Sequence, residues 1–187
     1  QTDTNGEDSG ASYVVFGKAS GFEATSNLSN LDGSNGFRLE GGAAGDLSGR
    51  SVSSAGDFNG DGFDDLIIGA YGVDSNGEDS GASYVVFGKA SGFSASLNLT
   101  ELSGSEGLSL DGLTLGDAFG KSVSSAGDVN NDGFDDLIIG APFGDGGIIN
   151  SGAGYVIFGR SFASESASIR TNSPTSNDFV NDGVLGE

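Results

Sequence analysis

The chain has 187 residues, enough for one domain with a substantial core. Its 27 acidic residues outnumber 7 basic ones, and the net charge of −20 disfavours nucleic acid and anionic membranes as partners and favours cations. Cys and His are absent, which excludes disulfides, Cys-His and Ser-His-Asp catalysis, and the usual transition-metal ligands. No apolar run is long enough to span a membrane, so membrane insertion is not expected.

Read from its N-terminus, the chain alternates short apolar segments with turns rich in Gly, Ser, Asn and Asp, which is typical of β-strands. No segment shows a convincing helical period. The expected strands are Ala11–Gly17, Phe37–Gly41, Ser51–Ala55, Leu66–Ala70, Ser83–Phe87 and Leu108–Asp111. Asn76-Gly77 predicts a hairpin turn between the fourth and fifth of these. Near the C-terminus, residues 161–177 are expected to form a loop, followed by a weak strand near Phe179–Gly183.

The sequence repeats with a period of 71 residues. Asp57, for example, is equivalent to Asp128 in the next repeat. Four expected strands per repeat predict an all-β fold of four-stranded antiparallel blades of a β-propeller. We expect residues 1–44 to be the C-terminal half of a blade (strands three and four), residues 45–115 a full repeat, and residues 116–187 a full repeat with a degenerate final part. About two and a half blades are too few to close a ring, which takes roughly four to eight. Further repeats of a longer chain, or other copies of this one, are therefore expected as partners.

Two acidic loops, Asp57–Asp65 and Asp128–Asp136, carry oxygen side chains at positions 1, 3, 5 and 9 and Gly at position 6. This alternation suits Ca²⁺, a hard cation that takes oxygen ligands from a tight loop. Position 12 is Ile rather than the Glu of an EF-hand. The predicted ligands are the side chains of Asp57, Asn59, Asp61 and Asp65 with the Phe63 carbonyl, and those of Asp128, Asn130, Asp132 and Asp136 with the Phe134 carbonyl.

The alternative for each loop is a polar turn without metal. Several carboxylates within one short loop repel one another unless a cation is bound, and the loop occurs twice in the same phase, which favours the metal. Asp64 and Asp135, at position 8, are expected to face solvent or to lie behind the ligands. The acidic segment Asp74–Asp79 lacks Gly at position 6, so a turn is expected there. Asn27 and Asn98 fit the glycosylation sequon, a pattern common in so polar a chain.

These motifs resemble the FG-GAP repeats of the integrin α-chain propeller and of related bacterial proteins. The segments that match the family are Phe119-Gly120, the loop Asp128–Asp136 and Gly140-Ala141-Pro142. The first repeat matches less completely, because Ser48 replaces the Phe and Tyr71 replaces the Pro. The resemblance implies that each acidic loop joins the first two strands of a blade and binds Ca²⁺, which gives two sites in this chain.

We therefore expect an extracellular or cell-surface, calcium-binding structural or adhesion module, not an enzyme, in which Ca²⁺ rigidifies the first hairpin of each blade. A cell-surface or matrix protein or a glycan is a further expected partner. An alternative is a subunit of a self-assembling filament or ring in which chains complete each other's blades. An Asp/Glu-based hydrolase is a weaker alternative, because the loops account for the acidic pairs.

Overall fold

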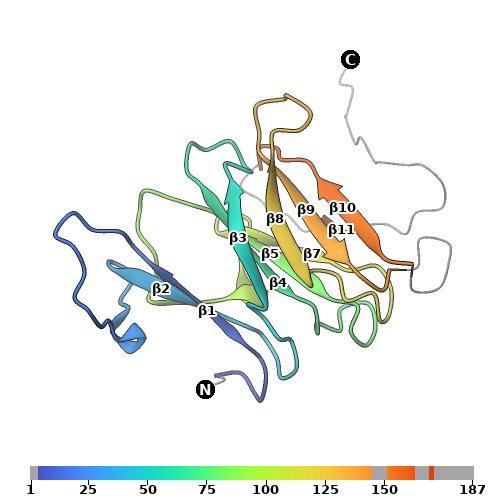
Figure 1. Ribbon diagram of the computed structural model, residues 1–187, viewed down its shortest axis with the longest axis horizontal. Helices are drawn as coiled ribbons and strands as arrows, with labels where there is room; N and C mark the ends of the chain where they lie inside the picture. Colours follow the sequence, from blue (N-terminus) through green and yellow to red (C-terminus); the bar gives the residue numbers. More distant parts are fainter. Residues whose placement is uncertain (1–3, 145–150, 163–168, 171–187) are drawn as a thin grey trace.

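The structure is a computed structural model that describes residues 4–144, 151–162 and 169–170 (Figure 1). Its regular elements are strands and two single turns of 3₁₀ helix (η1 and η2). In chain order they are β1 (Ala11–Val15), η1 (Leu28–Asn30), β2 (Gly36–Glu40), β3 (Ser51–Gly56), β4 (Asp65–Ala70), β5 (Ala82–Val86), β6 (Ser96–Asn98), η2 (Leu99–Glu101), β7 (Gly107–Asp111), β8 (Ser122–Gly127), β9 (Asp136–Ala141), β10 (Ala153–Ile157) and β11 (Ile169–Arg170). None of the described helices is long and apolar enough to cross a membrane.

The described strands form three sheets, with the orders β1-β2-β6, β3-β4-β5-β7-β11 and β8-β9-β10. In the middle sheet, β3, β4, β5 and β7 follow one another in chain order as antiparallel neighbours, as a propeller blade requires. The first sheet holds the counterparts of β5 and β7, and the last sheet holds those of β3, β4 and β5. The predicted all-β fold of propeller-type blades is confirmed. The weak strand expected near Phe179–Gly183 lies outside the described residues.

Two short strands, β6 and β11, were not predicted. Each pairs in parallel with a strand of the preceding sheet, β6 with β2 and β11 with β7. The expectation of a loop over residues 161–177 is thus wrong at Ile169–Arg170. Strands of two or three residues carry no readable alternation, so only the neighbouring sheet reveals them. Each short strand thus links the repeat that follows to β2 or β7, the last long strand of the preceding sheet.

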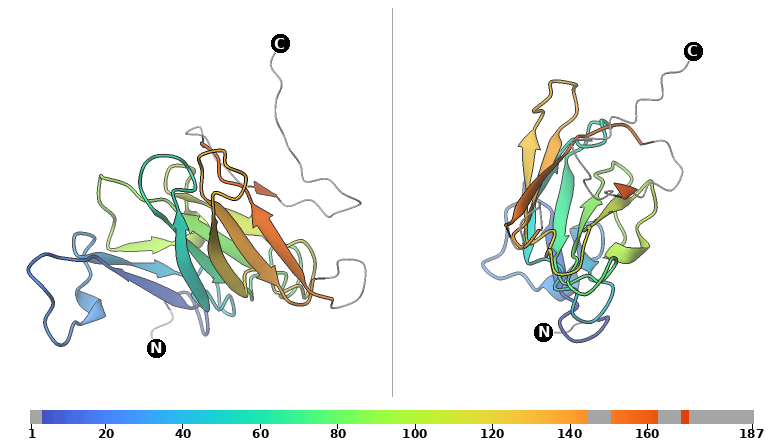
Figure 2. Two further views of the ribbon diagram at one scale, coloured as in Figure 1. Left: turned by 45° about the horizontal axis from the view of Figure 1, so that its top comes forward. Right: turned by 90° about the vertical axis from the view of Figure 1, so that its right-hand side faces the viewer.

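The hydrophobic core lies between the sheets, which stand face to face in Figure 2. Successive residues of a strand point to opposite faces, so β4 contributes to two clusters. Ile68 packs with Phe37 and Leu39 of the first sheet, whereas Ile67 packs with Leu137 and Ile139 of the last one. All six side chains are buried. The central strands β4 and β5 of the middle sheet are therefore covered on both faces, which explains their nearly continuous burial.

The connection between β4 and β5 differs from the predicted Asn-Gly hairpin. A two-residue turn of that type needs Asn in the left-handed region, but the positive φ angles in this connection belong to Gly77 (+124°), Asp79 (+52°) and Gly81 (+81°). The Asn76 side chain instead donates to the Gly112 carbonyl at 2.7 Å, which ties this loop to the end of β7. The prediction of a turn over Asp74–Asp79, rather than a metal site, agrees with the Asp79 N–H donating to the Asp74 carboxylate at 2.8 Å.

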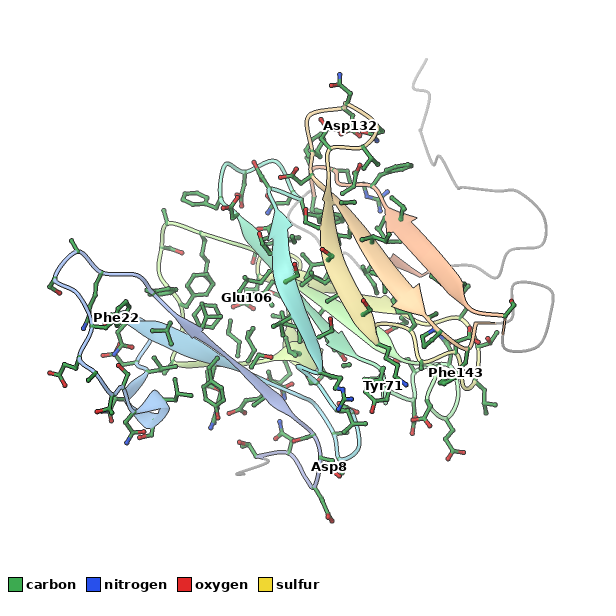
Figure 3. The ribbon with its side chains drawn as sticks, viewed as in Figure 1. Asp8, Phe22, Tyr71, Glu106, Asp132 and Phe143 are labelled. Atoms are coloured by element: carbon green, nitrogen blue, oxygen red, sulfur yellow. The ribbon has the colours of Figure 1, made fainter. Side chains whose placement is uncertain are left out.

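Both acidic loops project from the same end of the sheets, between β3 and β4 and between β8 and β9 (Figures 1 and 2). A bulge precedes each loop, at Ser54/Gly56 and at Ser125/Gly127. Bulges bend a strand and change where the following chain points. In Figure 3, Asp132 marks this end of the molecule, while Tyr71, Phe143 and Asp8 lie at the opposite end.

Candidate metal centre

In the first acidic loop, three oxygen-bearing side chains converge on the loop interior. The Asp61 N–H donates both to Asp57 Oδ1 and to Asn59 Oδ1 at 2.9 Å, which brings these two oxygens together. The Gly62 N–H donates to Asp57 Oδ2 at 3.0 Å, and the Phe63 N–H donates to Asp61 Oδ1 at 2.9 Å. The loop backbone is thus wrapped around the side chains at positions 1, 3 and 5.

The second loop repeats this arrangement. The Asp132 N–H donates to Asp128 Oδ1 and to Asn130 Oδ1 at 3.0 Å, and the Gly133 N–H donates to Asp128 Oδ2 at 3.0 Å. The Phe134 N–H donates to Asp132 Oδ1 at 3.0 Å. Gly133 has φ +94°, and its counterpart Gly62 has φ +88°, a left-handed conformation that other residues rarely adopt. The Gly at position 6 therefore permits the turn that was predicted for it.

The position 9 carboxylates, Asp65 and Asp136, lie at the base of the loops with no exposed surface. Asp65 accepts the Phe58 N–H at 3.1 Å and the Gly88 N–H at 2.8 Å. Asp136 accepts the equivalent N–H of Val129 and of Gly159, each at 2.9 Å. These carboxylates fasten each loop to the end of the third strand of its own sheet. The contribution of Gly88 and Gly159 was not foreseen, because it depends on chain segments distant in sequence.

The pKa of the Asp65 carboxyl is raised to about 7, because burial and, to a smaller extent, the nearby charge of Asp61 outweigh the N–H groups of Gly88 and Phe58 that lower it. Burial disfavours an ionised carboxylate unless positive charge compensates it. A divalent cation beside Asp65 would supply such a charge. The loop is therefore electrostatically better suited to hold a cation than to remain without one.

The donor set fits a hard cation, because each loop gathers carboxylate and amide oxygens and no softer ligand. Carboxylates alone do not make the site: within residues 4–144, 151–162 and 169–170, no three acidic side chains group closely enough to hold a metal ion by themselves. The amide oxygens of Asn59 and Asn130 complete the convergent trio in each loop. Phe63 and Phe134, whose backbone carbonyls are predicted to bind, each lie two residues after the last side chain of the trio.

Other predicted features have structural roles. Asn27 and Asn98, which fit the sequon, cap the two 3₁₀ turns η1 and η2, and their side chains accept the N–H of Ser29 and of Thr100. Asp64 is exposed, as expected. Asp135 is half-buried against the first loop, so the two position 8 residues are not equivalent. Sequence reasoning missed this contact, and the only signal for it is the recurrence of Asp at position 8.

Comparison with known proteins identifies the same units. The family model "FG-GAP repeat" matches residues 48–86 and 119–157. Each match begins just before the first strand of a sheet and ends on its third strand, so each includes one acidic loop.

Integrin α chains are among the similar proteins. Integrin alpha-3 of Cricetulus griseus is 39% identical over 106 residues, which is 56% of this chain and 9% of that protein. Integrin alpha-4 of Xenopus laevis is 36% identical over 106 residues, covering 57% of this chain and 9% of that protein. Integrin alpha-PS5 of Drosophila melanogaster is 36% identical over 95 residues, covering 50% of this chain and 8% of that protein. The chain thus corresponds to about a tenth of the length of these relatives.

Proposed function

Because the chain belongs to the FG-GAP repeat family, we propose that it is a calcium-stabilised structural or adhesion module of the cell surface or extracellular space. The observation that carries the proposal is the convergence of oxygens in both acidic loops, made by the same hydrogen bonds in each. The relatives are named as integrin α chains and not as enzymes, which favours a non-enzymatic role. Its partners would be further FG-GAP repeats and a cell-surface or matrix protein or a glycan.

The proposed ligands are those that the sequence predicted. In the first loop they are Asp57, Asn59, Asp61, Asp65 and the Phe63 carbonyl, and in the second they are Asp128, Asn130, Asp132, Asp136 and the Phe134 carbonyl. Ca²⁺ bound in this way would fix the hairpin β3–β4 and the hairpin β8–β9. Since metal binds only the folded loop, its binding free energy adds to the stability of the fold.

Calorimetric titration of the chelator-treated protein with CaCl₂ tests this proposal. We expect two sites in the wild type, one in Asp61→Ala and one in Asp132→Ala, because each substitution removes a convergent carboxylate. Glu78→Ala is the matched control, since it removes an exposed acidic residue outside both loops. If the wild type gives no binding heat and no calcium by elemental analysis, the calcium function is refuted.

A second candidate function is self-assembly, which one surface favours. Strand β1 has the same sequence as β5, Ala-Ser-Tyr-Val-Val, but among the described strands it pairs only with β2, whereas β5 also pairs with β4. A groove of about 530 Å³ lies along β1 and is lined by Val52, Leu66 and Ile68, at the place that a counterpart of β4 would take. Tyr13 is 41% exposed, while its counterpart Tyr84 is 4% exposed. A strand of a second copy could cover this surface by β-pairing.

The last sheet, β8-β9-β10, carries a second exposed apolar residue, on its outer face. Ile138 on the last sheet is 45% exposed, whereas its counterpart Ile67 on the middle sheet is fully buried against the last sheet. Two different surfaces that fit each other give head-to-tail contacts, and hence rings or filaments. This candidate rests on the open sheet faces and not on the acidic loops.

Mass photometry over a range of protein concentrations tests self-assembly. We expect oligomers in the wild type and monomers in Val15→Lys, because a charge on an exposed strand edge opposes β-pairing. Leu115→Lys is the control, since Leu115 is exposed on the loop between β7 and β8 and belongs neither to β1 nor to the last sheet. A wild type that stays monomeric at high concentration, with and without calcium, would refute self-assembly.

A further inference from the structure

The second acidic loop is hydrogen-bonded to the first one through Asp135. Its carboxylate Oδ2 accepts the Asp57 N–H at 2.9 Å, and its own N–H donates to the Asp57 carbonyl at 3.2 Å. Both backbone polar groups of Asp57 are thus bound by one residue of the next repeat. Asp57 is the first proposed ligand of the first loop, so its backbone position decides where that carboxylate lies.

Close packing reinforces this contact on either side. A Cβ atom at Gly56 would collide with the Asp135 carboxylate, and one at Gly60 would collide with the Phe134 ring. Both glycines also have positive φ angles, +65° and +74°. At the loop base, the Arg160 N–H donates to the Phe58 carbonyl at 3.0 Å. The two loops therefore form one packed unit and not two independent turns.

The contact explains why the repeated Asp at position 8 behaves differently in the two loops. Asp135 points back to the loop of the preceding repeat. Asp64 has the same position in the first loop, but the preceding half-unit contains no acidic loop within its described residues, and Asp64 is exposed. The side chain at position 8 thus serves the preceding repeat rather than its own loop.

We propose that Asp135 is a positioning residue that couples the two cation sites, so that binding in the second loop strengthens binding in the first. This inference rests on the proposed function, because it presupposes that the loops bind Ca²⁺. A cation held by Asp132 and Asp136 restrains the residues between them, Asp135 included. A restrained Asp135 holds the Asp57 backbone in place, so the first loop loses less conformational freedom when it binds. Such coupling is reciprocal, and the first site strengthens the second by the same factor.

The coupling is tested by comparing Asp135→Ala with Asp64→Ala in calcium calorimetry. In a background where Asp132→Ala disables the second loop, only the first site is titrated. We expect Asp135→Ala to weaken this first site about tenfold, the loss typical of one hydrogen bond to a charged acceptor. Asp64→Ala removes the same charge from within the first loop itself, and we expect it to weaken the first site less than threefold. Asp135→Asn keeps an oxygen that can accept the Asp57 N–H and should restore most of the affinity.

Two further readouts separate coupling from a general loss of charge or of fold. In the chain without the Asp132→Ala background, Asp135→Ala should abolish the positive cooperativity of the two binding steps. In the metal-free protein, it should increase amide hydrogen exchange at Asp57 at least tenfold, with no comparable change in β5. Equal effects of Asp64→Ala and Asp135→Ala on the first site, or unchanged exchange at Asp57, would overturn the coupling. Absence of calcium binding in the wild type would instead refute the proposed function first.

Discussion

Removal of calcium with EDTA is expected to lower the melting temperature of this protein by roughly 10–20 °C. A ligand that binds only the folded state stabilises it by about 2.7 kcal/mol when its concentration is a hundred times its dissociation constant. Two such sites contribute about 5 kcal/mol, and a chain of this size changes its melting temperature by about 2–4 °C per kcal/mol. Circular dichroism melts with 5 mM CaCl₂ or with 5 mM EDTA measure the effect.

The charge of the first loop gives a physical reason to expect the effect. Without a cation, Asp65 is a fully buried carboxyl whose pKa is raised to about 7, and it stands near the charge of Asp61. Ionisation at neutral pH therefore destabilises the metal-free loop, whereas a bound divalent cation compensates both charges. The double variant Asp61→Ala/Asp132→Ala is the control, since its melting curve should no longer respond to EDTA. Overlapping wild-type melts in calcium and in EDTA would contradict this prediction.

Phe119→Ala is expected to destabilise the fold by about 3–5 kcal/mol, the usual cost of removing a buried aromatic ring. Phe119 is 1% exposed, and its ring packs edge to face on Tyr155 with centroids 5.3 Å apart. It belongs to the cluster between the middle and last sheets, so its loss leaves a cavity in their shared core. Urea denaturation in saturating calcium measures the change without interference from the metal sites.

Ser48 provides the matched control, because it occupies the position of Phe119 in the preceding repeat. Its hydroxyl is buried and has no hydrogen-bond partner among the described residues. Ser48→Ala should therefore leave stability unchanged or raise it by about 1 kcal/mol, since an unsatisfied buried hydroxyl is costly. Equal destabilisation by Ser48→Ala and Phe119→Ala would contradict the assignment of Phe119 to the shared core.

The acidic loops were predictable because their chemistry is local. Side chains at positions 1, 3 and 5 reach the same loop interior, and their hydrogen bonds to the following N–H groups span only two to five residues, as from Asp57 to Gly62. The main strands were predictable for a similar reason, since their apolar runs are bounded by Gly-rich turns. The strand β6 was missed because three residues cannot display a period, and its partner β2 lies in the preceding repeat.

By itself, the sequence determined the repeat length, the all-β fold and the position of two loops lined with oxygen side chains, because each depends on neighbours within one unit. Only the tertiary structure decided which equivalent positions have equivalent roles. Asp64 and Asp135 have the same place in the repeat, but only Asp135 has an acidic loop before it to contact. Ile67 and Ile138 likewise differ in burial because only Ile67 has a following sheet in the described structure to cover it. A repeat specifies each unit, but the contacts of a residue depend on whether a neighbouring unit stands beside it.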